Sequence, residues 1–285
     1  MEKQKDFSLI NCIATSLLAC FITVSGHELL HLLTHMVYGS KLLYYSAGAV
    51  DATVADWASL SVFDRIMVAG GSASIINALI AVILLIILLK AKNLKPLMRV
   101  FLTQLMGAQF VQGIGYFLIG GLFGAGDWGS VYERISDVPN VVNVLRVVLS
   151  VLGCGGIVAL FFILNHMSYY FIEDKDNKKE RLYVAFRLHL IVLIIGFTVG
   201  MICSGLSPAM KDGYLNWGTC FLFNFMWIPF FWGFMFTGVM KVLPPKKSRF
   251  LYRLPSDPNW ILLAIGIILV LIEIFIFGPG IYLGS

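Results

Sequence analysis

Charged residues are scarce in this chain. Of its 285 residues, Asp, Glu, Lys and Arg together make up 13%, whereas apolar residues make up 59%. A typical soluble domain has about 25% charged and about 45–50% apolar residues. A soluble globule with this composition would have too few charged residues to cover its apolar surface. A disordered chain and a nucleic-acid-binding domain are excluded on the same grounds. We therefore expect an integral membrane protein in contact with the lipid bilayer.

Cysteine is also sparse, and its spacing excludes two common kinds of site. The five cysteines form no CxxC pair, and four of them lie inside apolar runs. This pattern is neither a disulfide framework nor a zinc ribbon, so we expect most of the thiols to be buried. The sequence also lacks an internal repeat and a soluble domain of any size. We expect residues 1–285 to form a single integral-membrane domain.

Long apolar runs are what the chain has in abundance. Seven stretches exceed the length of about 20 residues that a helix needs to cross a bilayer. The predicted fold class is therefore all-α, a polytopic transmembrane helical bundle with about seven spans, or six if one stretch is re-entrant. The longest connector, 39–65, indicates a short hairpin or an interfacial segment. The stretches are 9–38, 66–89, 100–123, 141–172, 184–204, 215–240 and 260–282.

Basic residues are unevenly distributed over the connectors, and Lys- and Arg-rich short loops face the cytoplasm. With a cytoplasmic N-terminus, the inside segments hold 16 of these residues and the outside segments hold five. We predict an N-terminus inside, a C-terminus outside and a multi-pass location in a prokaryotic cell membrane. The inside residues are Lys3, Lys5, Lys90, Lys92, Lys95, Arg99, Lys175, Lys178, Lys179, Arg181, Arg187, Lys241, Lys246, Lys247, Arg249 and Arg253. The outside residues are Lys41, Arg65, Arg134, Arg146 and Lys211.

One motif in the first apolar stretch indicates chemistry. Gly26-His-Glu-Leu-Leu-His31 contains the pattern HExxH. On a helix, His27 and His31 lie one turn apart on the same face, so both imidazoles can bind one Zn²⁺ ion. Glu28 is offset from His27 by about 100° around the helix axis, where it can act as the catalytic base that takes a proton from water. Ionisable side chains at membrane depth are costly and functional by default. The alternative is a polar interhelical cluster without a metal.

A zinc site of this kind needs a third protein ligand. Asp127, in Gly124-Ala-Gly-Asp-Trp-Gly129, is the best candidate because it ends the third span at the predicted depth of His27. Its flanking glycines let the backbone turn so that the carboxylate points into the bundle. An ordinary turn aspartate is the alternative, and Asp51, Asp56 and Glu133 are rival ligands.

The other histidines are predicted to serve different roles. His35 lies eight residues beyond His27, about 12 Å along a helix axis, which is too far to bind the same ion. His35 is therefore expected to support the site or to lie at an interface. His166 and His189 are expected to be core or headgroup residues. Glu273, inside the last apolar stretch, is a further intramembrane acid without an assigned role.

These motifs together resemble the site-2 protease group, the M50 family of membrane-embedded zinc metalloproteases. The HExxH helix comes first. Ala69-Gly-Gly-Ser-Ala-Ser-Ile-Ile-Asn77 is similar to the family's A-G-P-x-x-N element, and Gly126-Asp-Trp-Gly129 stands where the family has N-P-x-D-G. The resemblance covers roughly residues 15–135, the expected metalloprotease-like core. The prolines of both elements are missing, and the asparagine is displaced, which indicates a divergent branch.

The resemblance implies specific roles for the matching residues. His27, His31 and Asp127 would hold Zn²⁺, and Glu28 would be catalytic. Asn77 would help to hold the backbone of the substrate, with a polar interhelical bond as the alternative. Typical site-2 proteases are reached from the cytosol, whereas the distribution of basic residues places this motif nearer the outer face.

The function predicted from the sequence is a zinc metalloprotease that hydrolyses peptide bonds within or at the edge of the bilayer. Its substrates would be membrane-embedded or membrane-associated proteins or peptides, and nucleic acid is not expected as a partner. The alternative is a non-catalytic membrane metal transporter or metal-handling protein that uses the same histidines. The sequence does not predict the oligomeric state.

Overall fold

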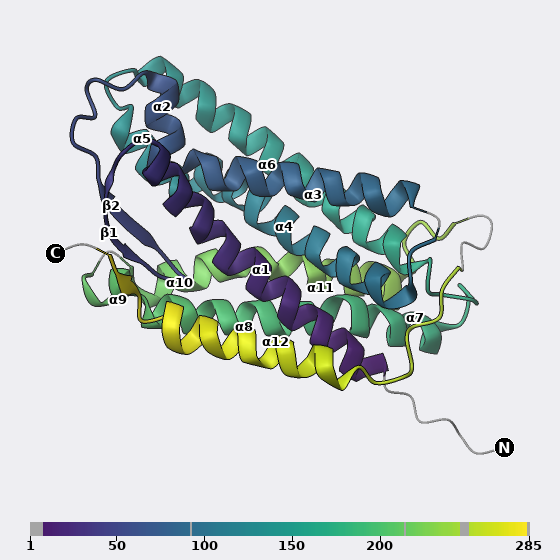
Figure 1. Cartoon of the computed structure of the whole chain (residues 1–285). Helices are drawn as coiled ribbons and strands as arrows, with labels where there is room; N and C mark the ends of the chain where they lie inside the picture. The colour runs from purple at the N-terminus through teal and green to yellow at the C-terminus, as the bar shows by residue number, and fades with distance from the viewer. Residues whose placement is uncertain (1–7, 92, 214, 246–250, 284–285) are drawn as a thin grey trace.

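The computed structural model describes residues 8–91, 93–213, 215–245 and 251–283. Within these residues, seven helical segments are long and apolar enough to cross a membrane, judged by length and composition. They lie side by side in an elongated bundle (Figure 1). The prediction of an all-α polytopic bundle with about seven spans is confirmed. The spans are Ser8–Val37, Val62–Lys90, Pro96–Phe123, Pro139–Ser168, Lys178–Leu206, Trp217–Met240 and Trp260–Phe277.

Three of these spans are single unbroken α-helices: α1 (Ser8–Val37), α4 (Pro96–Phe123) and α6 (Pro139–Ser168). The other four contain a π- or 3₁₀-helical insertion. The second joins α2 (Val62–Ile66), η1 (Met67–Gly71) and α3 (Ser72–Lys90), and the fifth joins α7 (Lys178–Ala185), η2 (Phe186–Leu190) and α8 (Ile191–Leu206). The sixth joins α10 (Trp217–Asn224), η3 (Phe225–Trp227), α11 (Ile228–Phe234) and η4 (Met235–Met240), and the seventh joins α12 (Trp260–Ile272) and η5 (Glu273–Phe277).

Helix α4 is the most buried span and packs against α1, α3 and α6. Its glycines allow close helix contacts, as small residues do between membrane helices. A Cβ on Gly113 would lie 2.5 Å from the backbone nitrogen of Ala78 on α3. The core of the bundle is therefore built around the helix that leads to Asp127.

Short elements gather at one end of the bundle, which we call the hairpin end (residues 38–61, 124–138 and 207–213). Strands β1 (Lys41–Tyr45) and β2 (Val50–Thr53) form an antiparallel hairpin, which confirms the hairpin expected in 39–65. Strand β3 (Ile281–Tyr282), which the sequence did not predict, pairs with β1. The short helices α5 (Asp127–Arg134) and α9 (Pro208–Lys211) also lie here (Figure 1).

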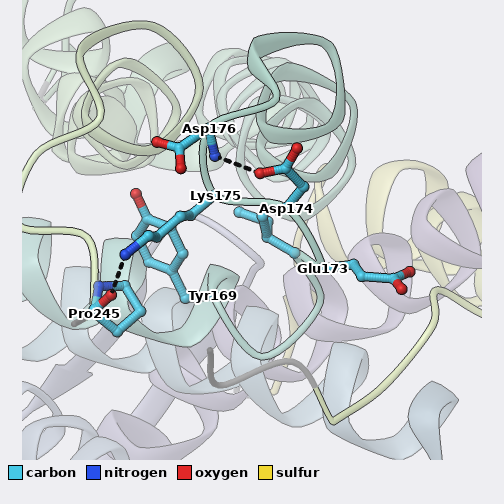
Figure 2. Close-up of a pocket in the computed structure, with 7 residues that line it drawn as sticks. Tyr169, Glu173, Asp174, Lys175, Asp176 and Pro245 are labelled. Carbon is cyan, nitrogen blue, oxygen red and sulfur yellow. Dashed lines mark hydrogen bonds between the residues drawn. The ribbon is translucent and has the colours of Figure 1, made fainter. Parts of the chain in front are cut away.

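The opposite end, which we call the α7 end (residues 91, 93–95, 169–177, 241–245 and 251–259), contains the other connectors. A pocket here lies between the turn after α6 and the segment after η4 (Figure 2). Lys175 Nζ donates a hydrogen bond of 3.2 Å to the carbonyl oxygen of Pro245, and Lys241 forms an ion pair with Asp176. These contacts join the two connectors.

Six of the basic residues used to predict the orientation lie outside the described residues: Lys3, Lys5, Lys92, Lys246, Lys247 and Arg249. The start of α1 lies at the α7 end, and strand β3 lies at the hairpin end (Figure 1). Because the number of spans is odd, the first span begins and the last span ends at opposite ends of the bundle. Which end faces the cytoplasm stays a prediction from the distribution of basic residues.

Candidate metal centre

Helix α1 places the two motif histidines side by side. Because α1 is unbroken, His27 and His31 are one turn apart, and their Nε2 atoms lie 3.3 Å from each other. The side chain of His27 is 2% exposed and that of His31 is 11% exposed. Both rings therefore present the same nitrogen to one point inside the protein.

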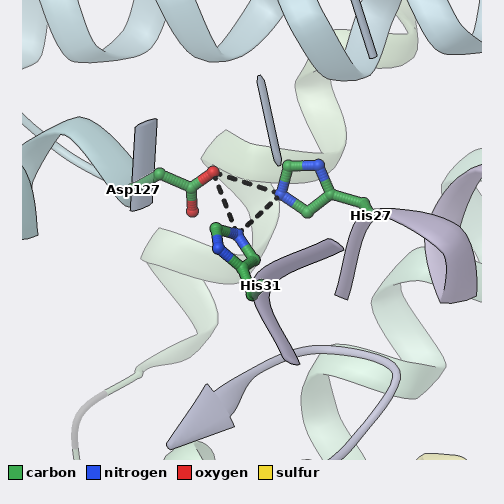
Figure 3. Close-up of side chains that lie close together, drawn as sticks. All are labelled: His27, His31 and Asp127. Carbon is green, nitrogen blue, oxygen red and sulfur yellow. Dashed lines mark hydrogen bonds and ion pairs between the residues drawn. The ribbon is translucent and has the colours of Figure 1, made fainter. Parts of the chain in front are cut away.

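Asp127 reaches this point from a different part of the fold. Helix α4 ends at Phe123, and the chain reverses through Gly124 and Gly126, whose φ angles of +62° and +66° favour glycine. Asp127 is the first residue of α5, and its Oδ2 atom lies 3.1 Å from His27 Nε2 and 3.3 Å from His31 Nε2 (Figure 3). The structure thus brings together the three residues that the sequence proposed as metal ligands.

The distances among these three atoms fit a tetrahedral ion. Zinc bonds to nitrogen and oxygen of about 2.0–2.1 Å separate neighbouring tetrahedral ligands by roughly 3.3–3.4 Å. The three observed separations are 3.1, 3.3 and 3.3 Å. In addition, Asp127 Oδ2 is buried and makes no hydrogen bond of normal geometry. An oxygen in that situation calls for another partner, such as a cation.

The charge state of Asp127 also suits a cation. Burial opposes ionisation of its carboxyl, but the adjacent imidazoles of His31 and His27 outweigh burial and hold the pKa of Asp127 below its usual range. The carboxylate is therefore charged at neutral pH. Two imidazoles and one carboxylate make up a donor set typical of catalytic zinc sites, in which water is the fourth ligand.

Two residues from other helices hold the His27 ring. Asn77 on α3 is buried, and its Nδ2 lies 2.7 Å from His27 Nδ1. Tyr116 on α4 stacks on the same ring, with centroids 4.7 Å apart and planes inclined by 16°. The polar interhelical bond weighed for Asn77 is present, and a direct role toward substrate stays a prediction. Tyr116 belongs to no motif, so its role could not be read from the sequence.

The loop that bears Asp127 is fixed by its neighbour Trp128. The indole Nε1 of Trp128 donates a hydrogen bond of 3.1 Å to Ser74 Oγ on α3, and its ring packs against Phe117. In η1, just before α3, Gly70 interrupts the helical geometry with a φ of +146°. A Cβ on Gly70 would lie 2.8 Å from the carbonyl oxygen of Asp127. The Ala69–Asn77 element therefore contributes to the site through both its glycine and its asparagine.

Glu28 lies beside the three candidate ligands without joining them. It is 8% exposed and close enough to His27, His31 and Asp127 to interact electrostatically with all three. In the part of the chain that the structure describes, no side chain or backbone group hydrogen-bonds to its carboxylate. The carboxylate is therefore available to a water molecule at the site.

The remaining candidates lie apart from this centre. His35 Nδ1 lies 3.2 Å from Ser40 Oγ, and His189 Nε2 lies 2.6 Å from Ser168 Oγ, far along the bundle toward the α7 end. Asp56 accepts a hydrogen bond from the Ala58 backbone in an ordinary turn. Among the described residues, the only group of His, Cys, Asp and Glu arranged to hold a metal is His27, His31 and Asp127. The rivals Asp51, Asp56 and Glu133 are not part of it.

The acid inside the last apolar stretch, which had no role assigned from the sequence, contacts the helix that carries the motif. Glu273 on η5 is fully buried, and its Oε1 accepts a hydrogen bond of 3.0 Å from Ser25 Oγ, two residues before His27. The Tyr45 hydroxyl of strand β1 donates a hydrogen bond of 3.0 Å to the carbonyl oxygen of Ser25. The turn of α1 that precedes the motif is thus tied to the last span and to the hairpin.

No family model, curated protein or solved structure gives a significant match to the chain.

Proposed function

We propose that this protein is a membrane-embedded zinc metalloprotease of the site-2 protease type, in a divergent branch of the M50 family. The observation that carries the proposal is the convergence of His27, His31 and Asp127 on one point, with Glu28 beside them. The two histidines and the aspartate come from elements about 100 residues apart in the sequence. The proposed setting is a prokaryotic cell membrane.

In this proposal each residue of the site has a defined role. His27, His31 and Asp127 hold the ion through Nε2, Nε2 and a carboxylate oxygen. Zn²⁺ bound there supplies Lewis acidity, which acidifies water and polarises the scissile carbonyl. Glu28 accepts a proton as water attacks the carbonyl carbon, and then delivers it to the amide nitrogen as the C–N bond breaks.

The His27 ring must keep a fixed orientation in this scheme. A neutral imidazole that binds a metal through Nε2 carries its hydrogen on Nδ1, and an acceptor usually holds that hydrogen. Asn77 is the neighbour of Nδ1, and a 180° rotation of its amide group presents the amide oxygen as that acceptor. Asn77 is thus proposed as a positioning residue for His27.

The substrates proposed are membrane-embedded or membrane-associated polypeptides. Asp127 lies just past the end of α4, so the centre is close to the edge of the apolar region, where water can reach it. A helical substrate has its carbonyls bonded within the helix and must unwind locally before attack.

The direct test is the variant Glu28→Gln, compared with Glu133→Gln as a matched control. Glu133 is exposed on α5 and lies outside the metal centre. Purified full-length protein is assayed for zinc content and for cleavage of labelled casein and of a single-span test protein. We expect Glu28→Gln to keep its zinc and to lose cleavage, while Glu133→Gln keeps both. Full activity of Glu28→Gln would overturn the proposal. Exchange of zinc by a wild-type protein that cleaves neither probe would instead favour the metal-handling alternative.

A further inference from the structure

The metal centre is displaced toward one end of the bundle. His27 lies 10 residues, about 15 Å of helix, before the last residue of α1 at the hairpin end, and 19 residues after its first. Asp127 lies on a short helix outside the spans at the same end. A group that reaches the centre from the hairpin end crosses much less apolar protein than one from the α7 end.

Two of the three candidate ligands are partly exposed. The deepest ligand, His27, is 2% exposed, whereas His31, one turn nearer the hairpin end, is 11% exposed and Asp127 is 15% exposed. One turn further along α1, Thr34 Oγ1 donates a hydrogen bond of 2.9 Å to Ser72 Oγ. Polar side chains of α1 thus continue from the centre toward the hairpin end, which is the nearer end of the bundle.

Basic residues concentrate at the other end. Of the 15 Lys and Arg residues among the described residues, ten lie at or near the α7 end and five at or near the hairpin end. Lys90, Lys95, Lys178 and Lys179 are exposed near the ends of helices there. At the hairpin end, Arg65 instead pairs with Asp137. Because cytoplasmic loops carry the excess of Lys and Arg, this distribution favours the α7 end as the cytoplasmic one.

We infer that the metal centre opens at the non-cytoplasmic face of the membrane. Its substrates are then polypeptides whose cleaved bond is presented on that face, at or just beyond the outer end of a span. The same charge rule governs the substrates, so the segment next to that bond is poor in Lys and Arg. The substrate class rests on the proposed protease function, whereas the orientation does not.

The orientation is tested by labelling two single cysteines in intact cells that express the full chain. Ala55→Cys places a thiol in the hairpin-end connector, and Asn93→Cys places one in the connector between α3 and α4 at the α7 end. Both positions are exposed and uncharged, so neither substitution alters the distribution of basic residues. Both are made in a Cys154→Ala background, because Cys154 is the one exposed cysteine of the chain.

We expect a membrane-impermeant maleimide to label Ala55→Cys in intact cells and to label Asn93→Cys only after the membrane is permeabilised. The background chain shows the labelling of the buried cysteines, and labelling of both variants after permeabilisation shows that both thiols react. Labelling of Asn93→Cys in intact cells, or protection of Ala55→Cys, would overturn the orientation. The assay needs neither zinc nor hydrolysis, so its outcome is independent of the Glu28→Gln test.

Discussion

The carbonyl oxygen of Asp127 lies 2.8 Å from the point that a Cβ on Gly70 would occupy. Gly70 is the residue at which the second span departs from helical geometry, with a φ of +146°. A side chain at this position is disfavoured by the backbone as well as by the contact. The approach of the Asp127 loop to the second span therefore depends on one glycine.

We predict that Gly70→Ala lowers zinc content by displacing the Asp127 loop. The backbone strain alone is about 1–3 kcal/mol, and the contact with Asp127 adds to it. Zinc per protein and the thermal midpoint are measured on the purified variant. The control is Gly155→Ala, because a Cβ there meets nothing within 4 Å and Gly155 lies within α6. Equal zinc content in the two variants would contradict the prediction.

Asp127→Ala should weaken zinc binding more than any other change outside the HExxH motif, because it removes the charged ligand of the proposed site. Asp51→Ala is the matched control, since Asp51 was a rival ligand but lies on β2, outside the metal centre. Zinc affinity is measured by competition with a chelator of known strength. Normal affinity in Asp127→Ala would mean that another acid is the third ligand.

For Asn77→Ala we expect zinc affinity to fall by about 10–100-fold, the usual effect of losing a group that orients a metal-binding histidine. Asn165→Ala provides a matched comparison. Asn165 is also buried and hydrogen-bonded, to the Val242 carbonyl and to Thr237, but it lies away from the centre. It should lose stability and keep zinc affinity. If both variants lose stability and neither loses zinc affinity, Asn77 has only a structural role.

The ion pair between Arg65 and Asp137 predicts a pH dependence. The Arg65 hydrogen bond holds the pKa of Asp137 below its usual range. The lowered pKa means that this stabilisation is present above the ordinary pKa of an aspartate, about 3.9, and is lost as the pH falls through the lowered value. Asp137→Asn should therefore lower the thermal midpoint slightly at pH 7 and have no further effect at strongly acidic pH. The effect is small because Asp137 is exposed.

Much of this fold follows from composition and spacing. The seven apolar runs predicted the seven spans to within six residues at each end. They do so because a helix satisfies its own backbone hydrogen bonds in lipid. The four-residue spacing of His27 and His31 fixed their common face. The depth of Asp127 followed from counting residues in the first and third spans, and the structure places it beside the histidines.

What the sequence did not predict depends on contacts between distant segments. Tyr116 stacks on His27 only because α4 packs beside α1, and no local pattern around Tyr116 indicates this contact. The bond from Trp128 to Ser74 likewise requires the exact approach of α5 to α3. The π-helical insertions are also not marked in the sequence, because each one adds a residue to a helical turn without a Pro or a break in the run.

The packing of α1 against α12 has a consequence for biogenesis. Asn11 on α1 donates hydrogen bonds to the carbonyl oxygens of Pro255 and Asp257 and accepts one from the Asn259 backbone, and Gly266 on α12 packs against Leu17. Helix α1, which carries both motif histidines, is synthesised before α12, the helix that packs against this flank of it. During synthesis α1 waits in the membrane with that flank covered by lipid or by the insertion machinery. The contacts on this flank of α1 can therefore form only after α12 has entered the bilayer.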